Sequence, residues 1–594
     1  MQKFIHWLEE GRGGAVFRYV GATLFIVVFS IYLSGKRYTG PGGEVVMDQA
    51  VLARSLADGQ GFTTGVWRPQ PVALMEERHG WTPDGEERLP ELYSAPAYSV
   101  VLGAVLGVLP VDLRSWLESD PENSYYRADF FLLGVNLLLF WINLALVALI
   151  ANLLFNTRAA WLAGTGYLLS AGVWGGVLGV NGNVLLSFFI LLIVIVGVAV
   201  ERIRQPGISL LWPVLAGSLC GLLFLTDYPA GLALIPTLAY FAWRRIVSDE
   251  SPNWRLGGIW GALMLVAFSV TIAPWLWRNI DLTGNPLGLA AQEIAWRADD
   301  PTAEPAIVRS TFTAEMTAIS WRKLINKGLD GIGASLSEGL WEGGGFLFVG
   351  FFLAALFYRF KRSETDALRW YSLAMIAVLT FGAPFLDSAE APLLPGVWLA
   401  PLFIIFGAGF FFILMESAGD YSVWSKRGWV AGVVLLQALP LIHWILQPGV
   451  RAHFSFPPYA PIVFRSIEQD IAKKFYPGYG LMSDSPAGQC WYGGGNVWGQ
   501  PTLMGDFAQI VDRQPIGALV LTPTRLDRPF YTQLLKADHN TAGRDAARAY
   551  GWGAVYHGLA SGSLPSFFPL QKPMKIWDNV YVCLDPLARR PGSD

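Results

Sequence analysis

Apolar runs separated by short polar segments dominate the first three quarters of the chain. A helix must be about 20 residues long to cross the hydrocarbon core of a membrane. Runs near this length lie at 17–35, 128–154, 158–178, 183–200, 209–226, 228–243, 257–276, 341–359, 370–386, 396–415 and 428–446. The sequence therefore predicts a polytopic α-helical membrane protein with about 11 transmembrane helices.

The balance of charged and apolar residues agrees with this class. Only 15% of the 594 residues are charged, whereas 53% are hydrophobic. A soluble domain of ordinary composition carries nearer a quarter charged residues. The net charge of −3 gives no reason to expect a nucleic-acid partner. The histidines show no metal-ligand spacing, so we expect neither a metal nor a cofactor, although a divalent ion remains compatible with the sequence.

Lysine and arginine predict how the helices are oriented, because short cytoplasmic loops are enriched in both. Basic residues fill alternate loops if residues 96–110, which lie between Pro96 and Pro110, do not cross the membrane. This pattern places the N-terminus in the cytoplasm and residues 36–127 outside. We therefore expect a multi-pass protein of the cytoplasmic (inner) membrane. The basic residues that carry the argument are Arg158, Arg202, Arg204, Arg244, Arg245, Arg255, Arg359, Lys361, Arg362, Lys426 and Arg427.

The composition changes near residue 450, where polar residues, glycine and proline become frequent. Residues 517–522 and 580–584 have the apolar, β-branched character of buried strands, and residues 545–551 end like a helix before a glycine. We therefore divide the chain into a transmembrane domain at 1–449 and an extracytoplasmic α/β domain at 450–594. Cys490 and Cys583 could pair outside the cytoplasm, but two unpaired core thiols are favoured.

The first outer loop holds the densest polar stretch in the first half of the chain. A short helix is predicted there, ending at Asp58-Gly59, because glycine accepts the backbone conformation that follows a helix. Glu44 and Asp48 are four residues apart near its start and should project from one face. Carboxylates at that position either complement the helix dipole or form the acidic centre of a site.

Several segments resemble the GT-C class of membrane glycosyltransferases, which includes protein O-mannosyltransferases and aminoarabinose transferases. The helix end at 53–62 matches the Ala-Arg-x-Leu-x-x-Gly-x-Gly-Phe pattern of their first loop. Residues 93–98 stand where these proteins have a Pro-Pro-Leu-Tyr-like segment. Pro-Trp-x-x-Arg-Asn at 274–279 and Gly-x-Pro at 284–286 also match, and residues 483–492 resemble the outer domain of some bacterial members.

This resemblance implies transfer of a sugar from a polyprenyl-phosphate carrier to an acceptor at the outer face of the membrane. A carboxylate must take the proton of the acceptor hydroxyl, and Asp48 and Glu44 are the two candidates for this base. Arginine suits the phosphate of the carrier, although an arginine near a helix end also serves as a headgroup anchor. The candidate substrate-binding residues are Arg278, Arg54, Arg68 and Tyr98.

A second function is compatible with the same sequence. The late outer loop at 387–395, where GT-C members usually carry a base for the lipid phosphate, has neither lysine nor arginine. The alternative is a non-catalytic GT-C-like subunit that holds protein partners in a larger membrane assembly. Under either hypothesis the lipid bilayer is a partner, and the enzyme would also bind a lipid-linked sugar.

Overall fold

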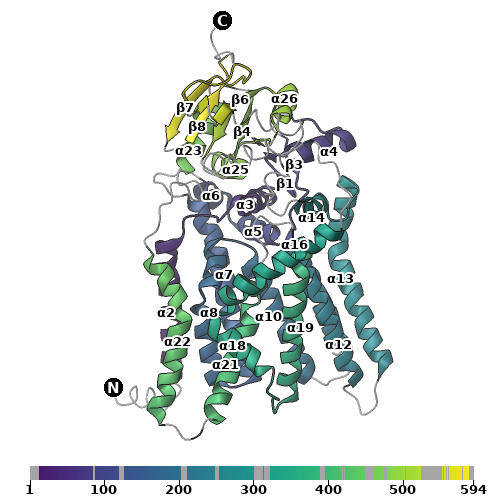
Figure 1. Cartoon of the computed structure of the whole chain (residues 1–594), viewed down its shortest axis with the longest axis vertical. Coiled ribbons are helices and arrows are strands. Elements are labelled where there is room, and N and C mark those ends of the chain that lie inside the picture. Colours follow the sequence, from purple (N-terminus) through teal and green to yellow (C-terminus); the bar gives the residue numbers. More distant parts are fainter. Residues whose placement is uncertain are drawn as a thin grey trace.

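The structure is a computed structural model of the 594-residue chain. It describes residues 13–83, 87–118, 126–202, 210–247, 253–299, 309, 312, 321–387, 395–417, 419, 422–447, 461–473, 476, 478–501, 503–522, 552, 554–556, 558–559, 561–577 and 580–586. Long helices form an upright body, and a smaller unit that contains a β-sheet lies at one end of it (Figure 1).

Among the described residues, seven helices are long and apolar enough to cross a membrane. Each coincides with a predicted apolar run. This confirms a multi-pass membrane protein. The seven helices are α2 (Gly13–Arg37), α7 (Arg127–Leu154), α10 (Asn183–Arg202), α13 (Trp254–Thr283), α19 (Ser363–Leu386), α21 (Ala400–Ser417) and α22 (Val423–Leu446).

The other four predicted runs form shorter or interrupted helices, so a count of about 11 spans stays a prediction. Two of the irregularities have a local cause. Gly345, with φ of +69°, separates two pieces of one run, and Pro229 lies in a 3₁₀ turn that starts another. The pieces are α8 (Thr157–Leu168), α9 (Ala171–Leu178), α11 (Leu211–Thr226), η1 (Tyr228–Ala233), α12 (Leu234–Val247), α17 (Leu340–Gly344) and α18 (Phe346–Ala355).

Residues 96–110 form a short helix that turns sharply. Helix α5 (Ala97–Val108) and helix α6 (Val111–Leu117) are bent by 118° at Pro110, and together they would count as an eighth span. Alone, the 12 residues of α5 rise about 18 Å, which is less than the roughly 30 Å of hydrocarbon. Helix α5 packs closely on α3 (Glu44–Ala57), where a Cβ added to Gly103 would lie 2.9 Å from the Ala53 carbonyl oxygen. Its length favours the prediction that it does not cross.

The β-sheet combines strands from the two ends of the chain. Its order is β2-β5-β4-β6-β8-β7, in which β2, β5, β4 and β6 are parallel and β8 runs antiparallel to both of its neighbours, β6 and β7. Strand β2 (Val66–Trp67) belongs to the first outer loop and pairs with β5 (Val497–Gly499). The remaining strands are β4 (Gly480–Ser483), β6 (Ile516–Leu521), β7 (Lys572–Trp577) and β8 (Val580–Leu584). The predicted strands at 517–522 and 580–584 are therefore β6 and β8.

Short elements fill the space between the sheet and the helical body. The C-terminal region contributes α23 (Pro461–Ser466), η3 (Ile467–Ala472), α25 (Pro486–Gly493) and α26 (Met504–Arg513). The first loop contributes α4 (Pro69–His79) and a two-stranded ribbon, β1 (Thr63–Thr64) with β3 (Leu89–Pro90). The middle of the chain contributes α14 (Ala290–Asp299), α16 (Trp321–Ala334), η2 (Ser335–Gly339) and α20 (Pro395–Trp398). The division at residue 450 stays a prediction, because the sheet also draws a strand from the first loop. The predicted helix end at 545–551 lies outside the described residues.

The three cysteines are buried and free. Cys490 lies in α25 and Cys583 in β8, so the favoured prediction of two unpaired core thiols agrees with the structure.

Candidate functional site

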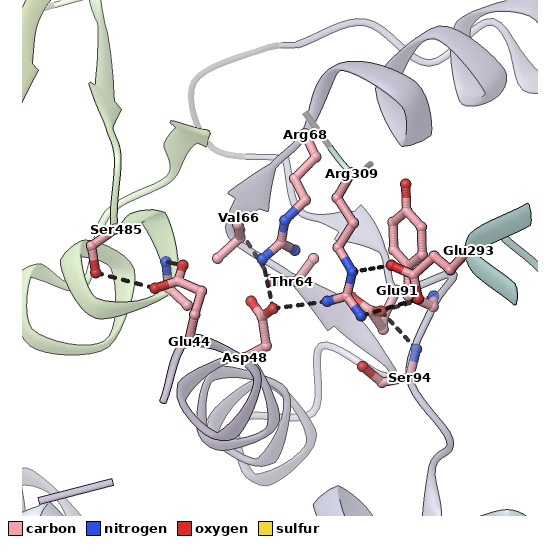
Figure 2. Close-up of polar contacts among 12 residues, drawn as sticks. Glu44, Asp48, Thr64, Val66, Arg68, Glu91, Ser94, Glu293, Arg309 and Ser485 are labelled. Atoms are coloured by element: carbon pink, nitrogen blue, oxygen red, sulfur yellow. Dashed lines mark hydrogen bonds and ion pairs between the residues drawn. The ribbon is translucent and has the colours of Figure 1, made fainter. Parts of the chain in front are cut away.

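Asp48 lies at the centre of a buried group of charges beneath the sheet (Figure 2). Its Oδ2 atom accepts a hydrogen bond from Arg68 Nη2 at 2.6 Å and another from Arg309 Nη1 at 3.4 Å. Only 1% of Asp48 is exposed, and both arginines are buried. The three side chains come from α3, from the end of β2 and from the segment after α14, so the site exists only when these elements pack together.

Two further carboxylates complete the group. Arg309 Nε donates to Glu293 Oε1 at 2.5 Å, and Arg309 Nη2 donates to Glu293 Oε2 at 3.4 Å. Glu91 accepts two backbone hydrogen bonds, from Tyr93 N at 2.9 Å and from Ser94 N at 3.0 Å. Glu91 and Glu293 are at most 2% exposed. We call Asp48, Arg68, Glu91, Glu293 and Arg309 the acid–arginine cluster.

Local sequence explains how these side chains are aimed. Helix α3 begins at Glu44, so Asp48 lies one turn further along. Arg68 is the residue before α4, with φ of −115° and ψ of 145°, which is the extended conformation favoured before proline. The following Pro69 occupies the first turn of α4, where its missing N–H is not needed.

Burial and ion pairing act on these carboxylates in opposite directions. Burial raises the pKa of Asp48, and Arg68 and Arg309 oppose that rise by favouring the charged form. Burial likewise raises the pKa of Glu293, against the opposing effect of Arg309. With all five groups ionised, three carboxylates face two guanidinium groups. Such a cluster is stable only because nearly every buried charge has a partner.

One carboxylate oxygen of Asp48 takes no part in the hydrogen bonds with Arg68 and Arg309. Oδ1 is buried, and within the described part of the chain no group forms a hydrogen bond with it. A buried carboxylate oxygen normally has a hydrogen-bond partner. The arrangement therefore leaves one acceptor position open beside two fixed guanidinium groups.

Glu44 points away from the cluster, toward the C-terminal region (Figure 2). Its carboxylate accepts hydrogen bonds from Ala487 N at 2.6 Å and from Ser485 Oγ at 3.1 Å. These atoms lie at the start of α25, where an acidic group is favoured by unpaired N–H groups and by the helix dipole. Glu44 therefore ties α3 to α25, and its charge also acts on Arg68.

Arg54 and Tyr98 also lie outside the cluster. Arg54 donates to the Tyr126 hydroxyl at 2.9 Å, pairs with Glu118 at 2.9 Å and stacks over the Trp491 ring at 4.1 Å. The Tyr98 hydroxyl is buried and hydrogen-bonded to Asn136 Oδ1 at 2.9 Å and to the Val180 carbonyl at 2.7 Å. Both side chains hold neighbouring elements together in this arrangement.

Arg278 lies next to the cluster and contacts its backbone. It donates to the carbonyl oxygens of Glu91 at 3.0 Å and Phe62 at 3.1 Å, and it stacks on Trp275 at 4.7 Å. The predicted site residues therefore separate into three groups. Asp48 and Arg68 form a hydrogen bond, Arg278 is adjacent, and the hydrogen bonds of Glu44, Arg54 and Tyr98 described above go to other elements. The catalytic or binding role of each remains a prediction.

Sequence reasoning missed Glu91, Glu293 and Arg309. Glu91 is the one acid within Leu-Pro-Glu-Leu-Tyr at 89–93, and Glu293 is the one acid within the mostly apolar stretch at 289–296. A lone carboxylate among apolar residues signals a buried charge that needs a partner. Arg309 lies in a segment without periodicity, so no comparable signal was available for it.

Comparisons with known proteins show which solved structures share this fold. No known family profile matches the chain, and no curated protein does so either. The oligosaccharyltransferase AglB of Archaeoglobus fulgidus, solved with an inhibitory peptide and a dolichol-phosphate, is 11% identical with a TM-score of 0.51, over 87% of this chain and 71% of that one. The same enzyme tethered to an acceptor peptide gives 10% identity and a TM-score of 0.54, over 92% and 72%.

A third similar structure is ArnT from Cupriavidus metallidurans bound to undecaprenyl phosphate, with 14% identity and a TM-score of 0.45 over 89% of this chain and 97% of that one. The oligosaccharyltransferase and ArnT are both GT-C glycosyltransferases. The similarity to the oligosaccharyltransferase extends over most of this chain, so the chain has the GT-C fold. At this level of identity the similarity establishes the fold alone.

The acid–arginine cluster does not fit a metal ion. One structure of the archaeal oligosaccharyltransferase is a complex with Zn and sulfate. Within the described ranges of the present chain, no group of three or more His, Cys, Asp or Glu residues could hold a metal. Arg309 bridges Asp48 and Glu293, so a guanidinium group occupies the space between the two carboxylates (Figure 2). Arginine here supplies positive charge that a cation could provide.

Proposed function

We propose that this protein is a membrane glycosyltransferase that moves a sugar from a polyprenyl-phosphate carrier to an acceptor at the outer face of the membrane. The GT-C fold and the apolar helices support this class. The observation that carries the proposal is the state of Asp48: Oδ2 is fixed by two arginines, whereas the buried Oδ1 has no hydrogen-bond partner among the described residues. A general base needs such a fixed carboxylate with one oxygen free to accept a proton.

The proposed reaction assigns a role to each member of the cluster. Asp48 Oδ1 accepts the proton of the acceptor hydroxyl as the hydroxyl oxygen bonds to the anomeric carbon of the sugar. The bond from that carbon to the carrier phosphate breaks, and its electron pair leaves with the phosphate. Arg68 and Arg309 stabilise the charge on the phosphate, because guanidinium groups suit phosphate geometry. Glu91 and Glu293 hold the cluster in place, Glu293 by pairing with Arg309.

The carrier is proposed on separate grounds. The similar archaeal oligosaccharyltransferase has been solved with a dolichol-phosphate, which is a polyprenyl-type lipid phosphate. A membrane body of the same fold beneath the cluster would let a lipid carrier approach the arginines from the bilayer.

The burial of the acid–arginine cluster and the pairing of charges within it support a second candidate function. Asp48, Glu91 and Glu293 are at most 2% exposed, and Asp48 and Glu293 share Arg309. A cluster that is neutralised internally can serve fold specificity alone, as buried ion pairs do in some proteins. The alternative is therefore a non-catalytic GT-C-like subunit that holds partners in a larger assembly.

The substitution Asp48→Asn separates the two functions. The amide keeps an oxygen for Arg68 but cannot accept the proton, so we expect transfer from a panel of polyprenyl-phosphate sugars to fall about 10²–10⁴-fold. Glu44→Gln is the matched control, because Glu44 lies on the same helix but bonds to α25; it should retain transfer. Full transfer by the Asp48→Asn variant would exclude Asp48 as the base. A wild-type protein that transfers no sugar and yields no bound polyprenyl phosphate on lipid extraction would favour the scaffold.

A further inference from the structure

A pocket of about 380 Å³ opens at the end of the helical body remote from the sheet. It lies where the turn between α7 and α8 meets the turn between α18 and α19 and the last turn of α21. In Figure 1, α3, which carries Asp48, lies at the sheet-bearing end of the helical body, and the helix ends that border the pocket lie at the other end of that body. The volume is within the range of about 300–1,000 Å³ that is usual for sites binding small molecules.

The pocket has an apolar floor and a charged mouth. Phe155, Phe360, Phe412 and Ile413 supply the apolar surface, and Phe360 stacks edge-on against Phe155 at 5.7 Å. Lys361, Arg362 and Glu416 supply the charges, and all three are exposed. A free inorganic anion would gain nothing from the aromatic floor. The combination instead suits an amphiphile with a charged head and an apolar chain.

The charged residues differ in how firmly they are held. Arg362 Nη1 donates to the carbonyl oxygens of Leu153 and Leu154 at 3.4 Å each, which fixes it over the C-terminal end of α7. Lys361 and Glu416 form no hydrogen bond or ion pair with any residue that the structure describes. Two groups of opposite charge are therefore available at the mouth, with a fixed cation beside them.

The position of the pocket along the helices indicates which chemical class of ligand it can meet. Basic side chains gather at this end of the body. Arg158 lies in the first turn of α8, Arg202 and Arg244 lie in the last turns of α10 and α12, and Arg359 follows α18. Lysine and arginine concentrate at the membrane surface in this way, at the depth of lipid headgroups. The molecules present at that depth in high concentration are phospholipids.

We propose that this pocket binds a phospholipid whose headgroup carries both a phosphate and an amine. The phosphate lies between Lys361 and Arg362, the amine pairs with Glu416, and the first part of an acyl chain covers the aromatic floor. Glu416 repels a headgroup with negative charge alone, so an aminophospholipid binds more tightly than a phosphatidylglycerol. This site is independent of sugar transfer, because it lies at the other end of the body.

Native mass spectrometry of the delipidated full-length protein tests this site, with phosphatidylethanolamine and phosphatidylglycerol titrated in parallel. The wild type should retain more phosphatidylethanolamine. Lys361→Gln should weaken retention of both lipids about tenfold, as expected for one lost charge-assisted hydrogen bond. Glu416→Gln should abolish the preference while leaving phosphatidylglycerol retention equal or higher.

Lys426→Gln is the matched control, since Lys426 lies in the first turn of α22, at the same end of the helical body but not in the pocket; it should bind both lipids as the wild type does. The proposal fails if Lys361→Gln and Lys426→Gln have equal effects. It also fails if the wild type retains the two lipids equally, because Glu416 then does not discriminate between phosphatidylethanolamine and phosphatidylglycerol. Equal melting temperatures of the variants without added lipid exclude misfolding as the cause of any loss.

Discussion

The indole N–H of Trp491 donates a hydrogen bond to Asp129 Oδ1 at 2.8 Å. Trp491 belongs to α25 in the C-terminal region, and Asp129 lies in the first turn of α7, so the bond joins the sheet-bearing unit to the helical body. The second carboxylate oxygen of Asp129 accepts from the Tyr492 hydroxyl at 3.0 Å. Adjacent residues of α25 thus satisfy both oxygens of one buried acid.

Trp491→Phe should lower the stability of the whole protein. The substitution keeps an aromatic ring beneath Arg54 but leaves Asp129 Oδ1 without its donor. Leaving a buried acceptor unpaired costs about 1–3 kcal/mol. Thermal unfolding of the purified protein in detergent should show a lower Tm, and Tyr492→Phe should act in the same direction through the other oxygen. Unchanged Tm values in both variants would mean that this contact contributes little.

Arg309→Met should make the acid–arginine cluster respond to divalent cations. The substitution removes the cation that Asp48 and Glu293 share, and breaking a buried ion pair typically costs about 3–5 kcal/mol. We expect a lower Tm that Mn²⁺ or Zn²⁺ partly restores in the variant. The wild type should be insensitive to these ions and to a chelator. A wild-type Tm that falls on adding a chelator would contradict the view that arginine takes the place of a cation here.

Asp227, in the turn between α11 and η1, should make stability depend on pH. Burial, together with the nearby Asp387, raises the pKa of Asp227 to about 8. Between the ordinary carboxylate pKa of about 4 and this value, the folded protein holds a proton that the unfolded chain releases. Stability should therefore fall as the pH rises from about 5 to 8. Asp227→Asn should flatten the dependence and raise the Tm at pH 8, whereas Asp330→Asn at an exposed site should do neither.

The orientation of the chain can be tested by cysteine labelling of intact cells. Gln60 in the first loop and Ser561 in the C-terminal region are exposed and are predicted to lie outside. Gln60→Cys and Ser561→Cys should react with a membrane-impermeant maleimide, and Arg359→Cys should react only after permeabilisation. The three native thiols are buried, which keeps the background low. If only one of the two outer positions is labelled, the predicted number of membrane spans between them is wrong by an odd number.

The sequence predicted those parts of the fold that depend on local pattern. Long apolar runs became helices, and the apolar segment at 580–584 became β8. Breaks within runs were harder to predict, because a glycine such as Gly345 adopts a positive φ only where its neighbours require it. Hydropathy alone does not register such a requirement.

The candidate site was predicted in part, for a reason visible in α3. The spacing of Glu44 and Asp48 correctly put two acids at the start of one helix, but it could not say what each would meet. Glu44 faces α25, whose residues lie more than 400 positions later, and Asp48 faces Arg309. Contacts over such separations are set by tertiary packing, which a single sequence does not reveal.

The pairing of β2 with β5 also determines when this protein can be completed. Val66 and Trp67 leave the ribosome early, but their partners Val497 and Trp498 follow only after most of the chain. At about 5–20 residues per second, the first loop must wait on the order of 20–90 s for its strand partner. During that interval the Trp67 side chain, which is 1% exposed in the final structure, lacks its contact with Trp498, and Arg68 beside it has no fixed position. A nascent chain halted before residue 497 would thus present an unfinished loop to quality control, and the charge cluster would form among the last events of biogenesis.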